Sequence, residues 1–284
     1  MPLVVGASGL VGAALMRAIG ANAIGTFRTR PGEGLRHLDA HDRDATRALI
    51  RERDHEAVYF PAAEPNVDWC ESHPEEAYAA NVVPALMALA LSRETGAAFI
   101  FFSSDYVFDG ASGPYDETAP PAPLSVYGRH KLEVEERVLA AGGTVIRTAS
   151  VFGQEPPPGK NFVLRLVARL SAGEVVTVPF DQHSTPTWSD DLARGAIAVA
   201  SRPGLWHAAG PDFMARHRFA ELVAEVFGLD TALIQPVRTA DLGQAARRPL
   251  LGGLRSDRLA REMGIAFAPT RDALSRLREQ QRER

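Results

Sequence analysis

Tyr127 and Lys131 are four residues apart at the start of a segment with helical periodicity. On a helix this spacing places both side chains on one face, one turn apart. A lysine ammonium beside a phenol stabilises the phenolate and lowers the pKa of tyrosine from its usual value of about 10. The pair therefore predicts a tyrosine that serves as a general acid near neutral pH.

Ser104 is the third residue with a chemical role to consider. It lies in Ser103-Ser104-Asp105, directly after the apolar run 99–102. Ligands of parallel sheets bind at the carboxyl ends of the strands, so the Ser104 hydroxyl could hold a substrate carbonyl for protonation. A tyrosine and a lysine at this spacing are often only a surface pair. Together with the serine they predict a catalytic set of Ser104, Tyr127 and Lys131.

A glycine-rich turn follows the first apolar run, with the spacing G-x-x-G-x-x-G over residues 6–12. Glycines permit a tight turn and let a pyrophosphate approach backbone N–H groups at a helix N-terminus. The alternative is close packing of a strand on a helix. Placed at the first strand of an α/β pattern, the turn predicts dinucleotide contacts at Gly6, Ser8, Gly9, Leu10, Val11 and Gly12.

Two arginines follow the second apolar run, and no acidic residue occurs before Glu33. Enzymes selective for NAD place an Asp or Glu here to bind the ribose 2′-hydroxyl. The guanidinium of Arg28 or Arg30 instead matches the geometry of a 2′-phosphate. We therefore predict NADPH as the cofactor, with NADH possible and Arg28 the favoured contact because it lies nearer the strand end. The alternative is that both arginines are solvated loop residues.

The elements that must position these residues alternate in type through the first half of the chain. Apolar strand-like runs are separated by helical patterns at 10–19, 45–53, 75–94 and 126–141. This alternation predicts an α/β fold with a Rossmann-type doubly wound parallel sheet. The pattern becomes irregular after about residue 150. We expect a dinucleotide-binding domain over residues 1–150 and a smaller C-terminal α/β substrate lobe over 151–284, interleaved with the end of the first domain.

Composition narrows the class of protein. The 284 residues include 31 Lys and Arg against 35 Asp and Glu, a formal net charge of −4, which argues against nucleic acid as a partner. No apolar run is long enough to span a membrane, and the first strand-like run starts at Leu3, so we expect a cytoplasmic protein. Cys70 is the single cysteine, and no Cys/His cluster suggests a metal.

The motifs together resemble the extended short-chain dehydrogenase/reductases, and among them the dTDP-4-dehydrorhamnose reductase group. That group includes the regulatory beta subunit of methionine adenosyltransferase as a close relative. The most specific match is S-D-Y-V-F-D-G at 104–110. The other matching stretches, in family order, are 6–12, 62–63 with 67–68, 80–82, 127–131, 147–148 with 151–153, 161–163, 181–182 with 186–187, and 191–193.

The resemblance implies NADPH or NADH in the Rossmann domain and a nucleotide-sugar in a cleft beside the C-terminal lobe. Ser104, Tyr127 and Lys131 would form the triad: Tyr127 protonates a 4-keto sugar that receives a hydride, and Lys131 also holds the nicotinamide ribose. The remaining implied cofactor contacts are Leu38, Asp39, Ala62, Ala63, Glu64 and Asn81. The implied substrate contacts are Ser104, Asp105, Ser150, Gln182, Pro186 and Thr187.

The chain departs from the family pattern at three places. Ser150 stands where the reductases usually carry a Trp against the sugar, and Ser184 stands where they carry Gly. The family's Ala-Ala-Tyr-Thr is Ala-Ala-Glu-Pro at 62–65. Loss of an aromatic platform removes contact area, so the exact sugar stays open.

Three functions are consistent with these residues. The first is a reductase of a 4-keto nucleotide-sugar. The second is a non-catalytic NADP-binding subunit that regulates a partner enzyme, and the third is a nucleotide-sugar epimerase or dehydratase. A homodimer or a regulatory protein partner is possible in each case.

Several other residues are expected to be structural. We expect His130 to be a solvated helix residue, Cys70 a semi-buried thiol near the cleft and not a nucleophile, and Arg247-Arg248 an exposed basic pair, with a phosphate contact as the alternative. Packing is the expected role of the tryptophans, Trp69, Trp188 and Trp206. The histidines that show no metal-ligand spacing are His37, His41, His183 and His207.

Overall fold

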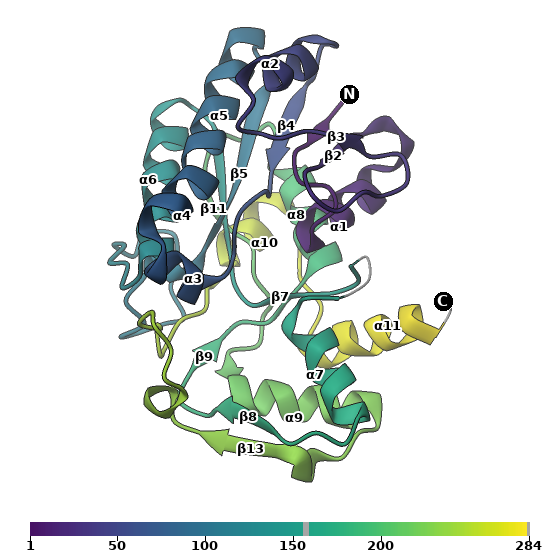
Figure 1. Ribbon diagram of the computed structural model, residues 1–284, viewed down its shortest axis with the longest axis vertical. Helices are drawn as coiled ribbons and strands as arrows, with labels where there is room; N and C mark the ends of the chain where they lie inside the picture. Colours follow the sequence, from purple (N-terminus) through teal and green to yellow (C-terminus); the bar gives the residue numbers. More distant parts are fainter. Residues whose placement is uncertain (156–158, 283–284) are drawn as a thin grey trace.

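The computed structural model describes residues 1–155 and 159–282, and within them seven strands form a central parallel sheet (Figure 1). These strands are β1 (Leu3–Val4), β2 (Ile24–Phe27), β3 (Arg36–His37), β4 (Ala57–Phe60), β5 (Ala98–Ser104), β6 (Thr144–Thr148) and β11 (Gly204–His207). Their order is β11-β6-β5-β4-β1-β2-β3, and every neighbouring pair is parallel. The doubly wound α/β fold expected from the alternating pattern is thus confirmed.

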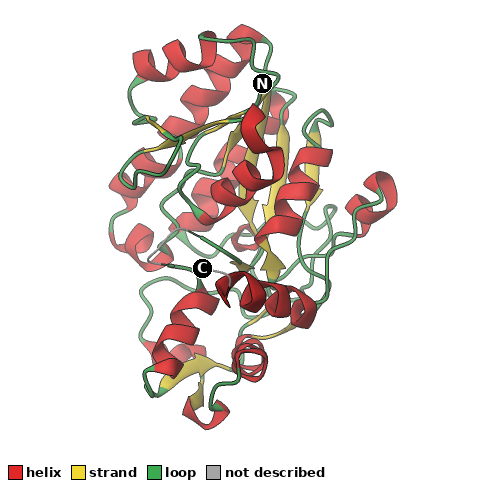
Figure 2. Cartoon of the chain, turned by 90° about the vertical axis from the view of Figure 1, so that its right-hand side faces the viewer, coloured by secondary structure: helices red, strands yellow, loops and turns green. Residues whose placement is uncertain are grey.

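The central strands are apolar on both faces because helices cover both sides of the sheet (Figure 2). In β5, Phe99 and Phe101 belong to the hydrophobic cluster under one layer of helices, whereas Ile100 and Phe102 belong to the cluster on the opposite face. All four side chains are buried. This is why the strand reads as an unbroken apolar run.

Two helical layers enclose the sheet. Helices α1, α8 and α10 lie on one side, and α2, α4, α5 and α6 lie on the other (Figure 1). Their bounds, with the short α3 that precedes α4, are α1 (Leu10–Ile19), α2 (Arg43–Arg51), α3 (Val67–Ser72), α4 (Pro74–Asn81), α5 (Val83–Thr95), α6 (Val126–Ala140), α8 (Ser189–Ala198) and α10 (Asp257–Met263).

One expected helix is divided in the structure. The pattern at 75–94 predicts a single helix, but α4 ends at Asn81 and α5 begins at Val83. Pro84 explains the break, because it occupies the first turn of α5, where its missing N–H is tolerated. The expectation of one continuous helix was therefore wrong.

A second hydrophobic cluster lies in the C-terminal part of the chain and is built from residues between 152 and 277. The remaining helices are α7 (Phe162–Ser171), α9 (Arg216–Phe227) and α11 (Thr270–Arg282). Short strand pairs complete this part: β7 (Val151–Phe152) with β10 (Thr187–Trp188), β9 (His183–Ser184) with β12 (Met214–Ala215), and β8 (Val176–Pro179) with β13 (Ile234–Val237). Because β11 joins the central sheet beside β6, the chain returns to the first part before it completes the second.

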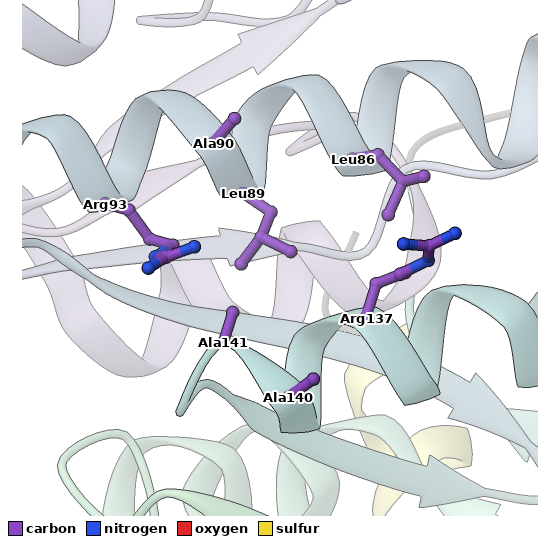
Figure 3. Close-up of a pocket in the computed structure, with 7 residues that line it drawn as sticks. All are labelled: Leu86, Leu89, Ala90, Arg93, Arg137, Ala140 and Ala141. Carbon is purple, nitrogen blue, oxygen red and sulfur yellow. The ribbon is translucent and has the colours of Figure 1, made fainter.

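None of the helices in the described ranges is both long enough and apolar enough to cross a membrane. A hollow of about 360 Å³ lies between α5 and α6, lined by leucines, alanines and two arginines, Arg93 and Arg137 (Figure 3). It contains none of the residues with predicted chemical roles.

Candidate active site

The glycine turn brings the first strand, the first helix and the loop after β4 into close contact. A Cβ on Gly6, which has φ +92°, would lie 2.9 Å from the Cβ of Ala62, and one on Gly12 would lie 2.3 Å from the Gly6 carbonyl oxygen. Helix α1 starts after Gly9, and no side chain caps it. Its first N–H groups are thus left for another acceptor, which makes this turn suitable for a phosphate group.

Asn81 holds the loop that runs beside this turn. Its Oδ1 accepts a hydrogen bond from the Glu64 backbone N–H at 2.7 Å, and its Nδ2 donates to the Glu64 carbonyl at 3.2 Å. The Asn81 side chain is buried, whereas Ala62, Ala63 and Glu64 are half-buried. Asn81 therefore holds in place the loop that carries the predicted cofactor contacts Ala62, Ala63 and Glu64.

The two arginines after β2 have different surroundings. Arg28 is exposed and follows directly after the strand, whereas Arg30 is half-buried. The Nη1 of Arg30 is buried without a hydrogen-bond partner among the described residues. Leu38 is buried nearby, and the Asp39 carboxylate contacts the His41 ring at 2.7 Å, a hydrogen bond that lowers the pKa of Asp39.

Tyr127 and Lys131 lie in the first two turns of α6. Ser125 caps the helix by accepting the Gly128 N–H at 3.2 Å. The Lys131 ammonium donates to the Phe102 carbonyl oxygen at 2.8 Å and lies 5.7 Å from the centre of the Tyr127 ring. This bond fixes the helix against β5, two residues before Ser104.

Burial dominates the titration of both side chains. It raises the pKa of Tyr127 and lowers that of Lys131 to about 8. With only the Lys131 ammonium considered, the sequence predicts a lowered pKa for Tyr127. That prediction omits desolvation of the phenol, and it does not hold in this structure.

Glu135 extends the same helix face by one further turn, a position that we did not single out from the sequence. Its carboxylate receives three hydrogen bonds from Arg147, two from Nε at 3.0 Å and one from Nη2 at 2.6 Å, and both side chains are buried. The charge of Glu135 acts to raise the pKa of Lys131 against the effect of burial. The signal in the sequence was the regular spacing of Tyr127, Lys131 and Glu135.

Ser104 ends β5 and contacts the carboxylate of the next residue. Its Oγ accepts the Tyr106 N–H at 3.2 Å and donates to Asp105 Oδ1 at 3.2 Å. The Asp105 Oδ2 accepts the Gly253 N–H at 3.0 Å and the Ser184 hydroxyl at 3.3 Å. Asp105 is 4% exposed, and burial raises its pKa. This carboxylate thus joins the end of β5 to two segments of the C-terminal part.

The other predicted substrate contacts lie in or directly before β7, β9 and β10. Ser150 has φ +43° and donates to the Ser184 hydroxyl at 2.9 Å. Pro186 and Thr187 are buried, and the Thr187 hydroxyl accepts the Gly210 N–H at 3.1 Å. Gln182 is half-buried, and its amide nitrogen lies 3.5 Å from the Gln244 side-chain oxygen.

Two arginines bring positive charge to this region. The Arg248 side chain is 8% exposed, contacts Asp68 at 2.5 Å and keeps Nη1 without a hydrogen-bond partner among the described residues. The expectation of an exposed basic pair is wrong for Arg248, because an aspartate 180 residues away covers it. Arg216 starts α9 with its guanidinium carbon 4.3 Å from the centre of the Phe162 ring. Burial and then the charges of Arg165 and Arg248 lower the pKa of Arg216, although Tyr106 acts in the opposite direction.

The residues expected to be structural differ in burial. Cys70 is fully buried, not semi-buried, and burial raises the pKa of its thiol to about 11, which disfavours a nucleophilic thiolate. His130 is half-buried with its ring 5.4 Å from that of Tyr78, so the expectation of a solvated residue was wrong. Trp188 and Trp206 are buried. The described residues contain no group of side chains that could hold a metal ion.

The parallel sheet, the glycine turn and the tyrosine and lysine on one helix are the features of an extended short-chain dehydrogenase/reductase. The family model described as RmlD substrate binding domain matches residues 1–282, and the chain belongs to this family. The resemblance found in the motifs is thus confirmed.

The proteins similar to this chain include named reductases and a methionine adenosyltransferase subunit. The chain is 34% identical to a probable dTDP-4,6-dihydroxy-2-methyloxan-3-one 4-ketoreductase of Streptomyces antibioticus, over 98% of this chain and 93% of that protein. It is 31% identical to methionine adenosyltransferase 2 subunit beta of Danio rerio, over 90% of this chain and 83% of that protein. The crystal structure of a dTDP-4-dehydrorhamnose reductase of Clostridium acetobutylicum has a TM-score of 0.88 at 28% identity, with 99% of each chain covered.

Proposed function

We propose that this protein is an NADPH-dependent reductase that acts on the ketone of a 4-keto nucleotide-sugar. The observation that carries the proposal is the hydrogen bond from Lys131 to the Phe102 carbonyl, 2.8 Å long. It holds Tyr127 and Lys131 at the carboxyl end of β5, where Ser104 lies. Relatives named as a ketoreductase and as a dTDP-4-dehydrorhamnose reductase support the reaction type.

The residues present suit a dinucleotide. Gly6 and Gly12 allow the tight turn between β1 and α1, and the uncapped N–H groups at the start of α1 suit a pyrophosphate. We assign the 2′-phosphate to Arg28 and Arg30, the nicotinamide ribose to Lys131, and the adenine side to Leu38 and Asp39. The loop with Ala62, Ala63 and Glu64, held by Asn81, would run beside the ribose and pyrophosphate. When bound, NADPH supplies the hydride for the reduction.

Tyr127 would donate the proton. Because burial raises its pKa, the phenol keeps its proton at neutral pH and gives it up only to a more basic oxygen. The oxygen of a ketone becomes such a base as it is reduced. Ser104 would donate a hydrogen bond to the same oxygen, for which its hydroxyl must turn away from Asp105.

The nucleotide part of the substrate carries a diphosphate, and Arg216 and Arg248 offer charge for it. Guanidinium groups remain protonated even when their pKa is lowered, and they bind phosphate oxygens in pairs. The unpartnered Nη1 of Arg248 supports this placement. Gln182, Pro186 and Thr187 are assigned to the nucleotide end, and Asp105 and Ser150 to the sugar.

A second candidate function is a regulatory subunit that binds NADP without catalysis. The similarity to methionine adenosyltransferase 2 subunit beta and the absence of the sugar-facing Trp at position 150 favour it. An intact triad does not separate the two functions, so activity must be measured.

The test is NADPH oxidation by the purified protein with a panel of 4-keto nucleotide-sugars. Saturable oxidation with at least one sugar is expected. No oxidation with any sugar, together with tight binding of a partner enzyme, would contradict the reductase and support the regulatory subunit.

Arg28→Ala should remove most of the preference for NADPH over NADH. A charge-assisted hydrogen bond to phosphate is worth about 1.5–3 kcal/mol, which corresponds to about 10- to 150-fold in affinity. NADH carries no 2′-phosphate, so its affinity should change little. Titrations of both cofactors into wild type, Arg28→Ala and Arg30→Ala measure the effect, with the exposed Arg53→Ala as a control. Equal affinity of wild type for the two cofactors would contradict the assignment.

A further inference from the structure

Two of the positions at which this chain departs from its family are in direct contact. Ser150 stands in place of Trp and Ser184 in place of Gly, and their hydroxyl oxygens lie 2.9 Å apart. The residues are 34 positions apart in the chain. A contact between two such departures suggests that they serve one purpose.

The direction of the hydrogen bonds follows from Asp105. The Ser184 hydroxyl donates its single proton to Asp105 Oδ2 at a distance of 3.3 Å. Ser184 can then only accept from Ser150, and Ser150 uses its own proton for that bond. The lone pairs of the Ser150 oxygen that remain can accept a hydrogen bond from another molecule.

The position of this oxygen is well fixed. The Ser150 backbone has φ +43°, and its carbonyl accepts the Thr187 N–H at 3.3 Å, which ties the residue to the neighbouring β10. Ser150 and Ser184 are both half-buried, so neither is closed off by the core. The same carboxylate that accepts from Ser184 also accepts from Ser104 on its other oxygen. The two serines are therefore connected to the proposed catalytic serine through Asp105.

We propose that Ser150 and Ser184 form a hydroxyl pair that selects the substrate, with Ser150 accepting a hydrogen bond from a hydroxyl group of the sugar. This inference rests on the proposed function and names a substrate class for it: sugars that carry a hydroxyl where the pair lies, in preference to their deoxy analogues. The Trp that the family's reductases usually carry at position 150 offers the sugar an apolar surface instead. A site built to bind a hydroxyl instead disfavours the analogue that lacks it.

The test uses sugars that bind but cannot be reduced. dTDP-glucose and its 2-, 3- and 6-deoxy analogues are titrated by calorimetry into the full-length protein saturated with NADPH. For the wild type, one of the deoxy analogues should bind about 3- to 10-fold more weakly than dTDP-glucose. This difference should disappear in Ser150→Ala and shrink in Ser184→Ala, which leaves Ser150 without its acceptor. The exposed Ser171→Ala serves as the control and should keep the difference.

Equal binding of all four sugars by wild type, or a difference that survives in both variants, would overturn the hydroxyl pair alone. The proposed reductase would stand in that case if any 4-keto sugar is reduced. Failure of every one of these sugars to bind would overturn both the nucleotide-sugar function and the selecting pair. Circular dichroism of the variants confirms that each one folds.

Discussion

Tyr127→Phe is expected to lower kcat for reduction by about 10²–10⁴-fold, the usual effect of losing a general acid. The substitution removes only the hydroxyl. The ring keeps its edge-to-face contact with Tyr106, whose centre lies 5.9 Å away. Affinity for NADPH should therefore remain close to that of the wild type, as measured by fluorescence titration alongside steady-state kinetics.

Tyr78→Phe provides a matched control for this substitution. Its hydroxyl also meets α6, where it donates to Glu133 at 2.8 Å, but it lies on the exposed side of the helix. Loss of this hydroxyl should leave turnover nearly unchanged. If Tyr127→Phe retains most of its turnover with a sugar that wild type reduces, Tyr127 is not the acid.

Lys131→Ala should impair both turnover and cofactor affinity, because one ammonium is assigned to the proton donor and to the ribose. The pKa of Lys131 in the folded chain is about 8, lowered by burial, so the ammonium is present below that pH and lost above it. In the wild type, kcat/KM should therefore fall as pH rises through about 8, since this parameter reports groups of the free enzyme. Lys131→Arg keeps its charge and should move this decline to higher pH.

The lowered pKa of Lys131 also makes the free energy of unfolding depend on pH. Because the folded chain holds the lysine proton less tightly than the unfolded chain, the cost of burying the ammonium is fully present below about pH 8. The free energy of unfolding should therefore increase as the pH rises from about 8 towards 10.5, the ordinary pKa of lysine. Urea unfolding of wild type and Lys131→Met at several pH values measures the difference.

The two roles assigned to Lys131, toward the proton donor and toward the ribose, have a separate test. Unchanged cofactor affinity in Lys131→Ala, together with an unchanged pH profile of kcat/KM, would refute them.

The parallel, doubly wound type of the central sheet could be predicted from the sequence because central strands such as β4 and β5 contain unbroken runs of buried apolar residues. Phe99 to Phe102 face two hydrophobic clusters in alternation, so the run has no polar residue that would obscure it. The glycine turn is equally local: Gly6 and Gly12 meet atoms of neighbouring segments that only glycine can approach. Helix α6 could be predicted from the helical pattern at 126–141.

Contacts between distant segments could not be predicted in the same way. Arg248 looks exposed in the sequence, and only folding brings Asp68 to it. Burial is the main cause of the raised pKa of Tyr127, and burial is a property of the whole fold. The contact between Ser150 and Ser184 joins the residue before β7 to strand β9, and the separation of these segments along the chain gives no indication of their proximity.

The most direct measurement of the central claim follows the hydride itself. The protein is incubated with a 4-keto nucleotide-sugar and NADPH deuterated at the transferable position of the nicotinamide, and the product is analysed by NMR. A reductase with Tyr127 as its acid predicts deuterium on the former carbonyl carbon of the sugar, formed by wild type and almost absent with Tyr127→Phe. A sugar recovered without deuterium, or labelled equally by wild type and Tyr127→Phe, would contradict it.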